Sequence, residues 1–342
     1  MTPAPPVLTP GDPAGIGGEL ALMAWRAGAA NDVPPFAVLD DPERLRRLAA
    51  TLGWDVPVAA IADPREAAHR FAGALPVVKH TFPRPVTPGT PDSGNAHAVV
   101  EAIDRAVQFA RAGHAGAVVT NPIAKAVVRA AGFAHPGHTE YLAHLASTGD
   151  AVPEPVMMLA APELRVVPVT VHMALKDVPG TLTAAAITHA ARTTARGLSR
   201  DFGVEQPRIA VAGLNPHAGE DGAMGREEIE VISPALESLR AEGLDVRGPL
   251  SADTLFHADA RGGYDAAVCM YHDQALIPLK TLDFAHGVNI TLGLPFVRTS
   301  PDHGTAFRIA GTGTADPTSL LEALRTARIM AANRTALDMG RG

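Results

Sequence analysis

Short runs of apolar residues alternate with longer segments in which apolar residues recur every three or four positions. The short runs are bounded by Gly or Pro and predict buried strands, whereas the longer segments predict amphipathic helices. Strands are expected at 5–9, 36–39, 75–78, 115–119, 165–171, 208–214 and 264–270. Helices are expected at 20–29, 41–52, 94–110, 183–200, 227–242 and 319–338. This alternation predicts an α/β/α sandwich with a largely parallel sheet.

Length and composition narrow the class of protein. The chain has 342 residues, of which 46% are hydrophobic and 19% charged, so it can bury a substantial core and form two domains. Its single cysteine, Cys269, excludes an internal disulfide and fits a reducing compartment. Neither a signal peptide nor a membrane span is predicted, because no apolar stretch has the required length and flanks. We therefore expect a cytoplasmic protein.

The charge balance bears on the kind of partner. A net charge of −7 argues against general nucleic-acid binding, so an anionic substrate would need a local basic cluster. Among 29 basic residues only Lys79, Lys125, Lys176 and Lys280 are lysines. In a chain this rich in Arg, a position that keeps Lys can be one that needs a compact ammonium. This argument applies best to Lys125 and Lys280, which lie beside motif-like segments. Alternatively, Lys125 is a solvated residue that opens the next helix.

Three predicted strands end beside a histidine. The strand at 165–171 runs into His172, the strand at 208–214 into Asn215-Pro216-His217, and the strand at 264–270 into Tyr271-His272-Asp273-Gln274. The carboxyl ends of parallel strands share one edge of the sheet, where ligands bind. Three imidazoles there can hold one divalent metal and leave positions open for substrate. The alternative for each histidine is a polar cap or a hydrogen-bonded core residue.

Several loops carry candidate binding residues. The Gly-rich turn at 11–19 lets backbone N–H groups approach an anion or a cofactor, although it is neither a Walker A loop nor a GxGxxG motif. A tight turn before a capped helix is the alternative. Gly137-His138-Thr139-Glu140 opens a helix, where Thr139 either helps to hold a phosphate or carboxylate or simply caps the helix. Lys280, Asn289 and Arg298 follow at nine-residue steps and suit a phosphate with a neighbouring polar group.

Together these segments resemble a known family. The resemblance is to 4-hydroxythreonine-4-phosphate dehydrogenases of pyridoxal phosphate biosynthesis, and it extends from Val7 to about Met330. It rests on the motifs at 11–17, 137–140, 215–220, 271–274, 288–298 and 302–306. It implies an isocitrate/isopropylmalate-dehydrogenase-like fold, a homodimer, and an active site in a cleft between two domains. We expect residues 1–127 with 300–342 to form the nucleotide side, and residues 128–299 to form the metal, substrate and dimer side.

The resemblance also implies roles for individual residues. His172, His217 and His272 would hold one divalent ion (zinc, magnesium or cobalt), and the family takes the last of these from the second subunit. Substrate contacts would be His138, Thr139, Lys280, Asn289 and Arg298. The cofactor would contact Gly11, Asp12, Asp302, His303, Gly304, Thr305 and Ala306. Three departures are Gly18, where the family pattern has Pro, Met173-Ala174, which follow His172 in place of a different pair, and a few extra residues near Thr148 to Glu154.

The implied reaction is the NAD- or NADP-dependent oxidation of 4-phosphohydroxy-L-threonine to 2-amino-3-oxo-4-phosphooxybutanoate. This β-keto acid then loses carbon dioxide to give 3-amino-2-oxopropyl phosphate. Asp273 and Asp253 are candidates to orient the histidines, and the general base would be a metal-bound water or a Lys280 of depressed pKa. Two alternatives stay open. One is a dehydrogenase of 4-phosphothreonate or 4-phosphoerythronate, and the other is a non-redox acyl or phosphoryl transferase or a silent binding protein.

Overall fold

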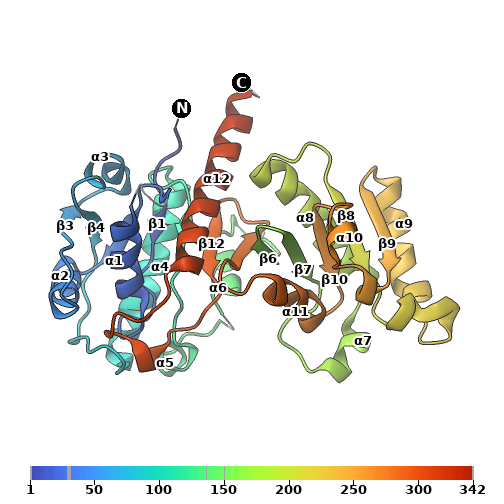
Figure 1. The fold of residues 1–342 in the computed structure, drawn as a ribbon, viewed down its shortest axis with the longest axis horizontal. Coiled ribbons are helices and arrows are strands. Elements are labelled where there is room, and N and C mark those ends of the chain that lie inside the picture. The colour runs from blue at the N-terminus through green and yellow to red at the C-terminus, as the bar shows by residue number, and fades with distance from the viewer. Residues whose placement is uncertain (1, 29–31, 136, 150, 341–342) are drawn as a thin grey trace. The chain divides into compact units, whose positions relative to one another are not determined.

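The computed structural model describes residues 2–28, 32–135, 137–149 and 151–340, and the chain divides into two compact units. Unit 1 comprises Met1–Pro155 and Leu294–Gly342, and unit 2 comprises Val156–Gly293. The chain therefore leaves unit 1 once and returns to it (Figure 1). Both units alternate strands with helices, which confirms the predicted mixed α/β class.

Unit 1 contains a parallel sheet with the strand order β3-β4-β2-β1-β5-β12. Its strands are β1 (Val7–Leu8), β2 (Ala37–Asp40), β3 (Val58–Ile61), β4 (Leu75–Lys79), β5 (Val118–Val119) and β12 (Arg298–Pro301). Its α-helices are α1 (Gly17–Ala27), α2 (Pro42–Thr51), α3 (Ala67–Arg70), α4 (Ala96–Arg111), α5 (Lys125–Ala130), α6 (His138–Leu145) and α12 (Thr318–Gly340). Short 3₁₀ turns occupy Pro64–Glu66, Ser93–Asn95 and Phe307–Ile309.

Local sequence signals explain the helix positions in unit 1. Helix α2 begins after Asp41, whose carboxylate accepts hydrogen bonds from the amides of Glu43 and Arg44, and Pro42 occupies its first turn. Helix α1 begins at Gly17, three residues before the predicted start, because the Gly-rich turn already has helical geometry there. Its predicted end, Ala29, lies outside the described residues.

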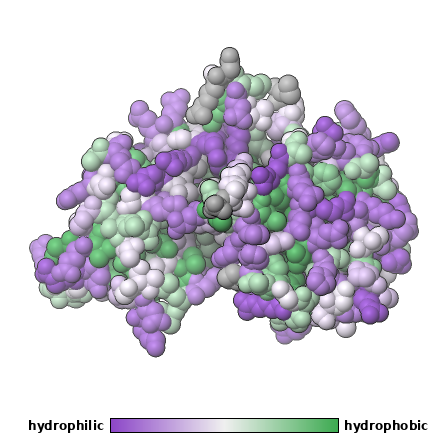
Figure 2. Space-filling view, turned by 180° about the vertical axis from the view of Figure 1, so that it is seen from behind, coloured by the Kyte–Doolittle hydropathy of each residue, from purple (hydrophilic) through white to green (hydrophobic). Residues whose placement is uncertain are grey.

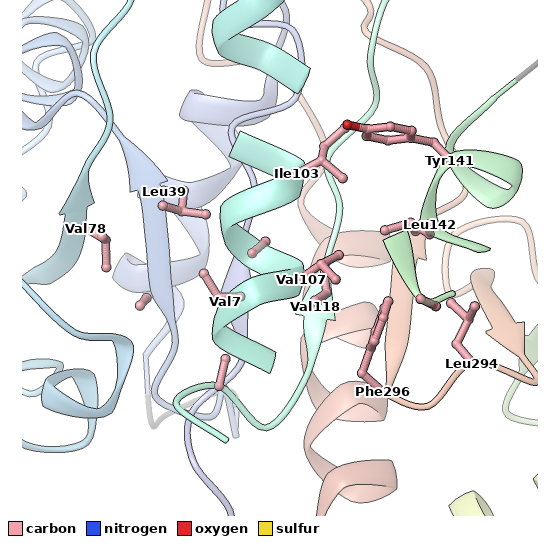
Figure 3. Packing of buried hydrophobic residues seen from close by; sticks show 14 of the residues in the cluster. Val7, Leu39, Val78, Ile103, Val107, Val118, Tyr141, Leu142, Leu294 and Phe296 are labelled. Atoms are coloured by element: carbon pink, nitrogen blue, oxygen red, sulfur yellow. The ribbon is translucent and has the colours of Figure 1, made fainter. Parts of the chain in front are cut away.

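The core of unit 1 forms where α4 covers the sheet. Val7 and Val118 from the strands and Ile103 and Val107 from α4 belong to one buried cluster (Figure 3). All four are almost fully buried, so the apolar stripe of α4 removes a continuous hydrocarbon surface from water. Helix α6 adds Leu142 to the same cluster and is thereby anchored over the sheet.

Unit 2 contains a mixed sheet with the strand order β11-β6-β7-β10-β8-β9. Its strands are β6 (Val156–Ala161), β7 (Leu164–Pro168), β8 (Arg208–Ala212), β9 (Asp245–Leu250), β10 (Ala266–Cys269) and β11 (Val288–Leu292). Strands β7, β10, β8 and β9 are parallel, whereas β6 runs antiparallel to both β7 and β11. Strands β6, β9 and β11 were not predicted from the sequence, and a tight turn joins β6 to β7.

The helices of unit 2 are α7 (Val178–Thr181), α8 (Ala184–Phe202), α9 (Ser233–Ala241), α10 (Ala258–Arg261) and α11 (His272–Leu282). Short 3₁₀ segments occupy Leu175–Asp177, Pro216–Gly222 and Ala252–Thr254, and a π-helical segment spans Glu228–Ile232. Helix α8 begins after Thr183, whose hydroxyl accepts from the amide of Ala186, and it ends at Gly203 with φ 70°.

The predicted helix at 227–242 is not continuous. Its first part is the π-helical segment, and regular α-helix begins only at Ser233. Pro234 has no N–H to donate to the preceding turn, so the backbone hydrogen bonds are rearranged there. The predicted strand at 165–171 likewise ends early, at Pro168.

Figure 2 shows a face on which hydrophilic residues predominate and apolar residues are scattered among them. Within the described residues, no helix combines the length and the apolar character that crossing a membrane would require.

Candidate functional site

Three neighbouring strands of unit 2 bring the predicted histidines to one edge of its sheet. Strand β10 lies between β7 and β8, and all three run parallel. His172 follows β7, His217 follows β8, and His272 opens α11 directly after β10. The carboxyl-end edge that the sequence pattern indicated is therefore the edge from which these side chains emerge.

Two of the three imidazoles lie close together. The ring centroids of His172 and His272 are 5.6 Å apart, and Nδ1 of His272 lies 2.7 Å from a carboxylate oxygen of Asp273. This contact fixes the ring orientation of His272, which is the arrangement expected for a histidine that presents its other nitrogen to a ligand. Among the described residues of the single chain, however, no three His, Cys, Asp or Glu side chains converge enough to hold a metal ion.

His217 lies in an unusual turn. Residues 217–221 all adopt left-handed backbone angles, with φ between 43° and 83°. Only Gly219 among them is a glycine, and left-handed geometry costs an L-residue with a side chain roughly 1–2 kcal/mol. A strained segment of this kind persists only when its surroundings hold it, and such segments cluster at functional sites.

The side chain that holds this turn is Glu228, in the π-helical segment. Its buried carboxylate accepts hydrogen bonds from the amides of Leu214 and Asn215, each at 2.7 Å, and from Nδ2 of Asn215 at 3.0 Å. A Cβ atom at Gly219 would approach Oε2 of Glu228 to 2.6 Å, so the turn packs directly on the carboxylate. Glu228 was not predicted from the sequence, because nothing in an acidic helical segment shows which carboxylate turns inward.

The other predicted residues of unit 2 have simpler surroundings. Asp253 accepts a hydrogen bond from the hydroxyl of Ser251 at 2.6 Å, which lowers the pKa of its carboxyl, with a smaller contribution from nearby His217. The ammonium of Lys280 lies 5.5 Å from the ring centroid of Phe284. Asn289 lies in β11 and pairs with Leu159 in β6.

A cationic cluster forms in unit 1 where β5, β12 and α6 meet. Arg298, the first residue of β12, is buried and donates from Nη2 to the hydroxyl of Thr120 at 2.7 Å. Burial lowers the pKa of its guanidinium to about 10, so the group stays charged. Lys125 opens α5, and its ammonium would lie 3.6 Å from a Cβ atom at Gly137, the residue that precedes α6.

His138 lies within reach of both cations. Burial lowers its pKa to about 3, and the positive charges of Arg298 and Lys125 add to the effect, so the imidazole is neutral. Its Nε2 atom is inaccessible to solvent and has no hydrogen-bond partner among the described residues, although part of the residue is exposed. A buried polar atom beside two cations is suited to a bound anion or hydroxyl group.

Thr139 does not cap the helix. Helix α6 is preceded by Gly137 in extended conformation, without a side-chain cap, and Thr139 lies in the first turn. The free amides of this first turn and the neighbouring cations are the features that favour anion binding at a helix start. Of the predicted substrate contacts, His138, Thr139 and Arg298 thus belong to unit 1, whereas Lys280 and Asn289 belong to unit 2.

The two predicted cofactor segments come together in unit 1. The amide of Ile16 donates to the carbonyl of Thr305 at 3.1 Å, and a Cβ atom at Gly15 would approach that oxygen to 2.8 Å. Asp12 closes the Gly-rich turn, because its carboxylate accepts from the amide of Ala14 at 3.0 Å. Its pKa is raised by burial, against smaller lowering effects of that hydrogen bond and of Arg44.

Buried polar atoms in and beside these loops lack partners within the described part of the chain. They are the Oγ1 atom of Thr9, the Oδ1 atom of Asn121 and the Nε2 atom of His303. Gly11, with φ 67°, packs so tightly on Asn121 and Pro122 that no side chain fits there. Close-packed glycines beside unsatisfied donors and acceptors are features of a loop that lies against a ligand.

Comparison with known proteins gives the family. A sequence model of the pyridoxal phosphate biosynthetic protein PdxA matches residues 32–327. The chain belongs to the PdxA family. It is 57% identical over 330 residues to a 4-hydroxythreonine-4-phosphate dehydrogenase of Methylorubrum populi, covering 96% of this chain and 94% of that one. The corresponding protein of Bradyrhizobium diazoefficiens is 53% identical over 339 residues, with 97% and 98% covered.

Solved structures agree with this assignment. The crystal structure of 4-hydroxythreonine-4-phosphate dehydrogenase from Klebsiella pneumoniae has a TM-score of 0.84 and 38% sequence identity, covering 96% of this chain and 99% of that one. The predicted membership of a dehydrogenase family in pyridoxal phosphate biosynthesis is therefore confirmed.

Proposed function

We propose that this chain oxidises 4-phosphohydroxy-L-threonine with NAD or NADP. The carbon that bears the secondary hydroxyl gives its hydride to the nicotinamide, and the hydroxyl gives its proton to a base, which yields 2-amino-3-oxo-4-phosphooxybutanoate. That β-keto acid then releases carbon dioxide, because the ketone accepts the electron pair of the breaking bond. The activity named for its relatives supports this reaction. The single observation that carries it in the structure is the cationic cluster around the neutral His138.

The cluster suits the phosphate end of such a substrate. Arg298 is charged and rigidly placed by its bond to Thr120, and Lys125 adds a second positive charge. A planar guanidinium and a compact ammonium are complementary to a dianion, and amides at the start of α6 supply further donors. His138, being neutral, can donate or accept one hydrogen bond without adding charge. We propose Lys280 and Asn289 as further contacts to the polar groups of the substrate.

The paired loops of unit 1 are proposed to bind the dinucleotide. The Gly-rich turn with Gly11 and Asp12 and the segment from Asp302 to Ala306 touch through Ile16 and Thr305, so one ligand can contact both. The unpartnered atoms of Asn121 and His303 would find partners in it. This assigns unit 1 to the nucleotide, and we retain the isocitrate/isopropylmalate-dehydrogenase-like cleft as part of the proposal.

The histidine edge is proposed as the metal site of a homodimer. Within one chain His172 and His272 are close, but three ligands do not converge in the described residues. We propose that the set is completed across a dimer, with His272 of the partner subunit joining His172 and His217. A divalent ion there, whether zinc, magnesium or cobalt, would supply Lewis acidity toward the substrate hydroxyl. Asp273 and Asp253 would orient the imidazoles, and Lys280 is the candidate base in this chain.

The proposal is tested by NADH formation from 4-phosphohydroxy-L-threonine, with 4-phosphoerythronate and 4-phosphothreonate assayed in parallel. Turnover of the first substrate with loss after Arg298→Met supports the assignment. Turnover of 4-phosphoerythronate or 4-phosphothreonate alone would instead indicate a dehydrogenase of a phosphorylated sugar acid. Metal binding without any NADH binding would instead indicate a non-redox protein.

A further inference from the structure

A buried ion pair lies directly behind the Gly-rich turn. Arg44 in α2 donates from Nε to Oδ1 of Asp40 at 2.8 Å, and its Nη2 atom contacts the second carboxylate oxygen. The exposed fractions of the two side chains are 7% and 0%. A bidentate pair removed from water in this way has one fixed geometry, because either charge alone would be costly to bury.

The remaining arm of the guanidinium reaches the turn itself. Nη1 of Arg44 donates to the carbonyl of Pro13 at 3.0 Å. All three nitrogens of the Arg44 guanidinium are thereby used, two on a fully buried carboxylate and one on the loop. The carbonyl of Pro13 lies between Asp12 and Ala14, the two residues that close the turn. The position of the turn is therefore tied to the end of β2.

Gly18 provides the space that this arrangement needs. A Cβ atom at Gly18 would lie 2.7 Å from Nη2 of Arg44 and 3.2 Å from Nη1. Even an alanine would have to displace the guanidinium, which Asp40 holds in place. The guanidinium of Arg44 can therefore occupy this position because residue 18 has no side chain.

We propose that Arg44 is a positioning residue for the dinucleotide loop, working with Gly18. Its guanidinium holds the Pro13 carbonyl and thereby the path of the turn, so that Ile16 stays bonded to Thr305. This inference rests on the proposed function, since it takes the turn as the dinucleotide site. It predicts that Arg44 sets the affinity for the dinucleotide and leaves the affinity for the phosphorylated substrate unchanged.

The test is Arg44→Lys, assayed by fluorescence titration of the whole protein with NADH. Lysine keeps the charge beside Asp40 but cannot also reach Pro13. We expect affinity for NADH to fall about tenfold, which corresponds to the loss of one hydrogen bond from a charged donor. The KM for 4-phosphohydroxy-L-threonine should not change. A purely structural role would lower thermal stability without this selective loss.

Arg46→Lys is the matched control. Arg46 lies in the same helix, pairs with Glu43 and donates to the carbonyl of Val58, but it does not touch the Gly-rich turn. Its replacement should leave NADH affinity unchanged. If Arg44→Lys and Arg46→Lys bind NADH equally well, the inference is wrong even though the enzyme is active. If the unaltered protein binds no NADH, the proposed function itself is wrong.

Gly18→Ala tests the same contact from the loop side. Alanine is the better helix former, so a loss of NADH affinity in this variant would not reflect a weaker helix, and we expect it from displacement of Arg44. The double variant with Arg44→Lys should bind no more weakly than Arg44→Lys alone, because both changes remove one contact. Additive losses of NADH affinity would contradict the coupling between Gly18 and Arg44. If Arg44→Lys fails to fold, the NADH affinity of Gly18→Ala decides whether the inference holds.

Discussion

Replacing Glu228 by glutamine should destabilise the turn that carries His217. The carboxylate accepts three hydrogen bonds, at 2.7, 2.7 and 3.0 Å, in a site where its side chain is buried. Glutamine keeps one acceptor for the two amides, loses the charge, and turns its NH₂ group toward Nδ2 of Asn215, which is also a donor. With hydrogen bonds to a charged group contributing about 1.5–3 kcal/mol each, we expect a net loss of about 2–3 kcal/mol.

The strain in the turn makes this loss local. Four residues with side chains, His217, Ala218, Glu220 and Asp221, hold left-handed angles at roughly 1 kcal/mol or more apiece, so the turn relaxes when the carboxylate no longer holds it. Hydrogen exchange of the Leu214 and Asn215 amides should accelerate first. Urea denaturation should then show the lower free energy of unfolding.

Glu227→Gln is the control. The neighbouring Glu227 is tied to this turn by the hydrogen bond that its carboxylate accepts from Nδ2 of Asn215 at 2.7 Å. We expect it to lower the free energy of unfolding by about 1 kcal/mol or less. The reasoning is refuted if Glu228→Gln and Glu227→Gln show the same unfolding free energy and the same exchange rates at Leu214 and Asn215.

Four further outcomes are expected. His217→Ala should abolish turnover and leave the circular dichroism spectrum unchanged; full activity would remove this residue from the site. Lys125→Met should raise the KM for the phosphorylated substrate and not that for NAD, and equal changes in both would contradict a phosphate contact. The pKa of His138 is lowered to about 3 from 6.5, so the unfolded chain binds a proton that the native chain does not. Stability should therefore decline as the pH falls through that window, and His138→Gln, but not His144→Gln, should flatten the decline measured by urea denaturation. A chelator should abolish NADH formation, and added zinc, magnesium or cobalt should restore it.

The fold was largely predictable because its strands and helices have clear periodicity. Helix α8, for example, is marked at one end by Thr183 and at the other by Gly203, and both signals are local. Strand β6 was missed because its pairing with β11 depends on contacts remote in sequence, although its hairpin with β7 is local. The π-helical segment was missed because a rearranged hydrogen-bond pattern leaves the apolar spacing of a helix almost unchanged.

The candidate-site residues that come shortly after a strand were predictable. The shared edge of His172 and His272 follows from parallel strands alone, and the structure has their rings 5.6 Å apart. The supporting residues were not predictable. Arg44 and Glu228 act through buried hydrogen bonds to loops 14 to 31 positions away, which no local pattern encodes. The number of residues between each of them and its loop follows no sequence rule, because only the packing of the fold brings them together.

The most direct test of the account is NADH formation by the metal-loaded protein given NAD and 4-phosphohydroxy-L-threonine, with 4-phosphoerythronate in a parallel cuvette. The account predicts turnover of the first substrate alone and its loss when a chelator is added. NADH formation from 4-phosphoerythronate alone, or from neither substrate with metal present, would contradict it.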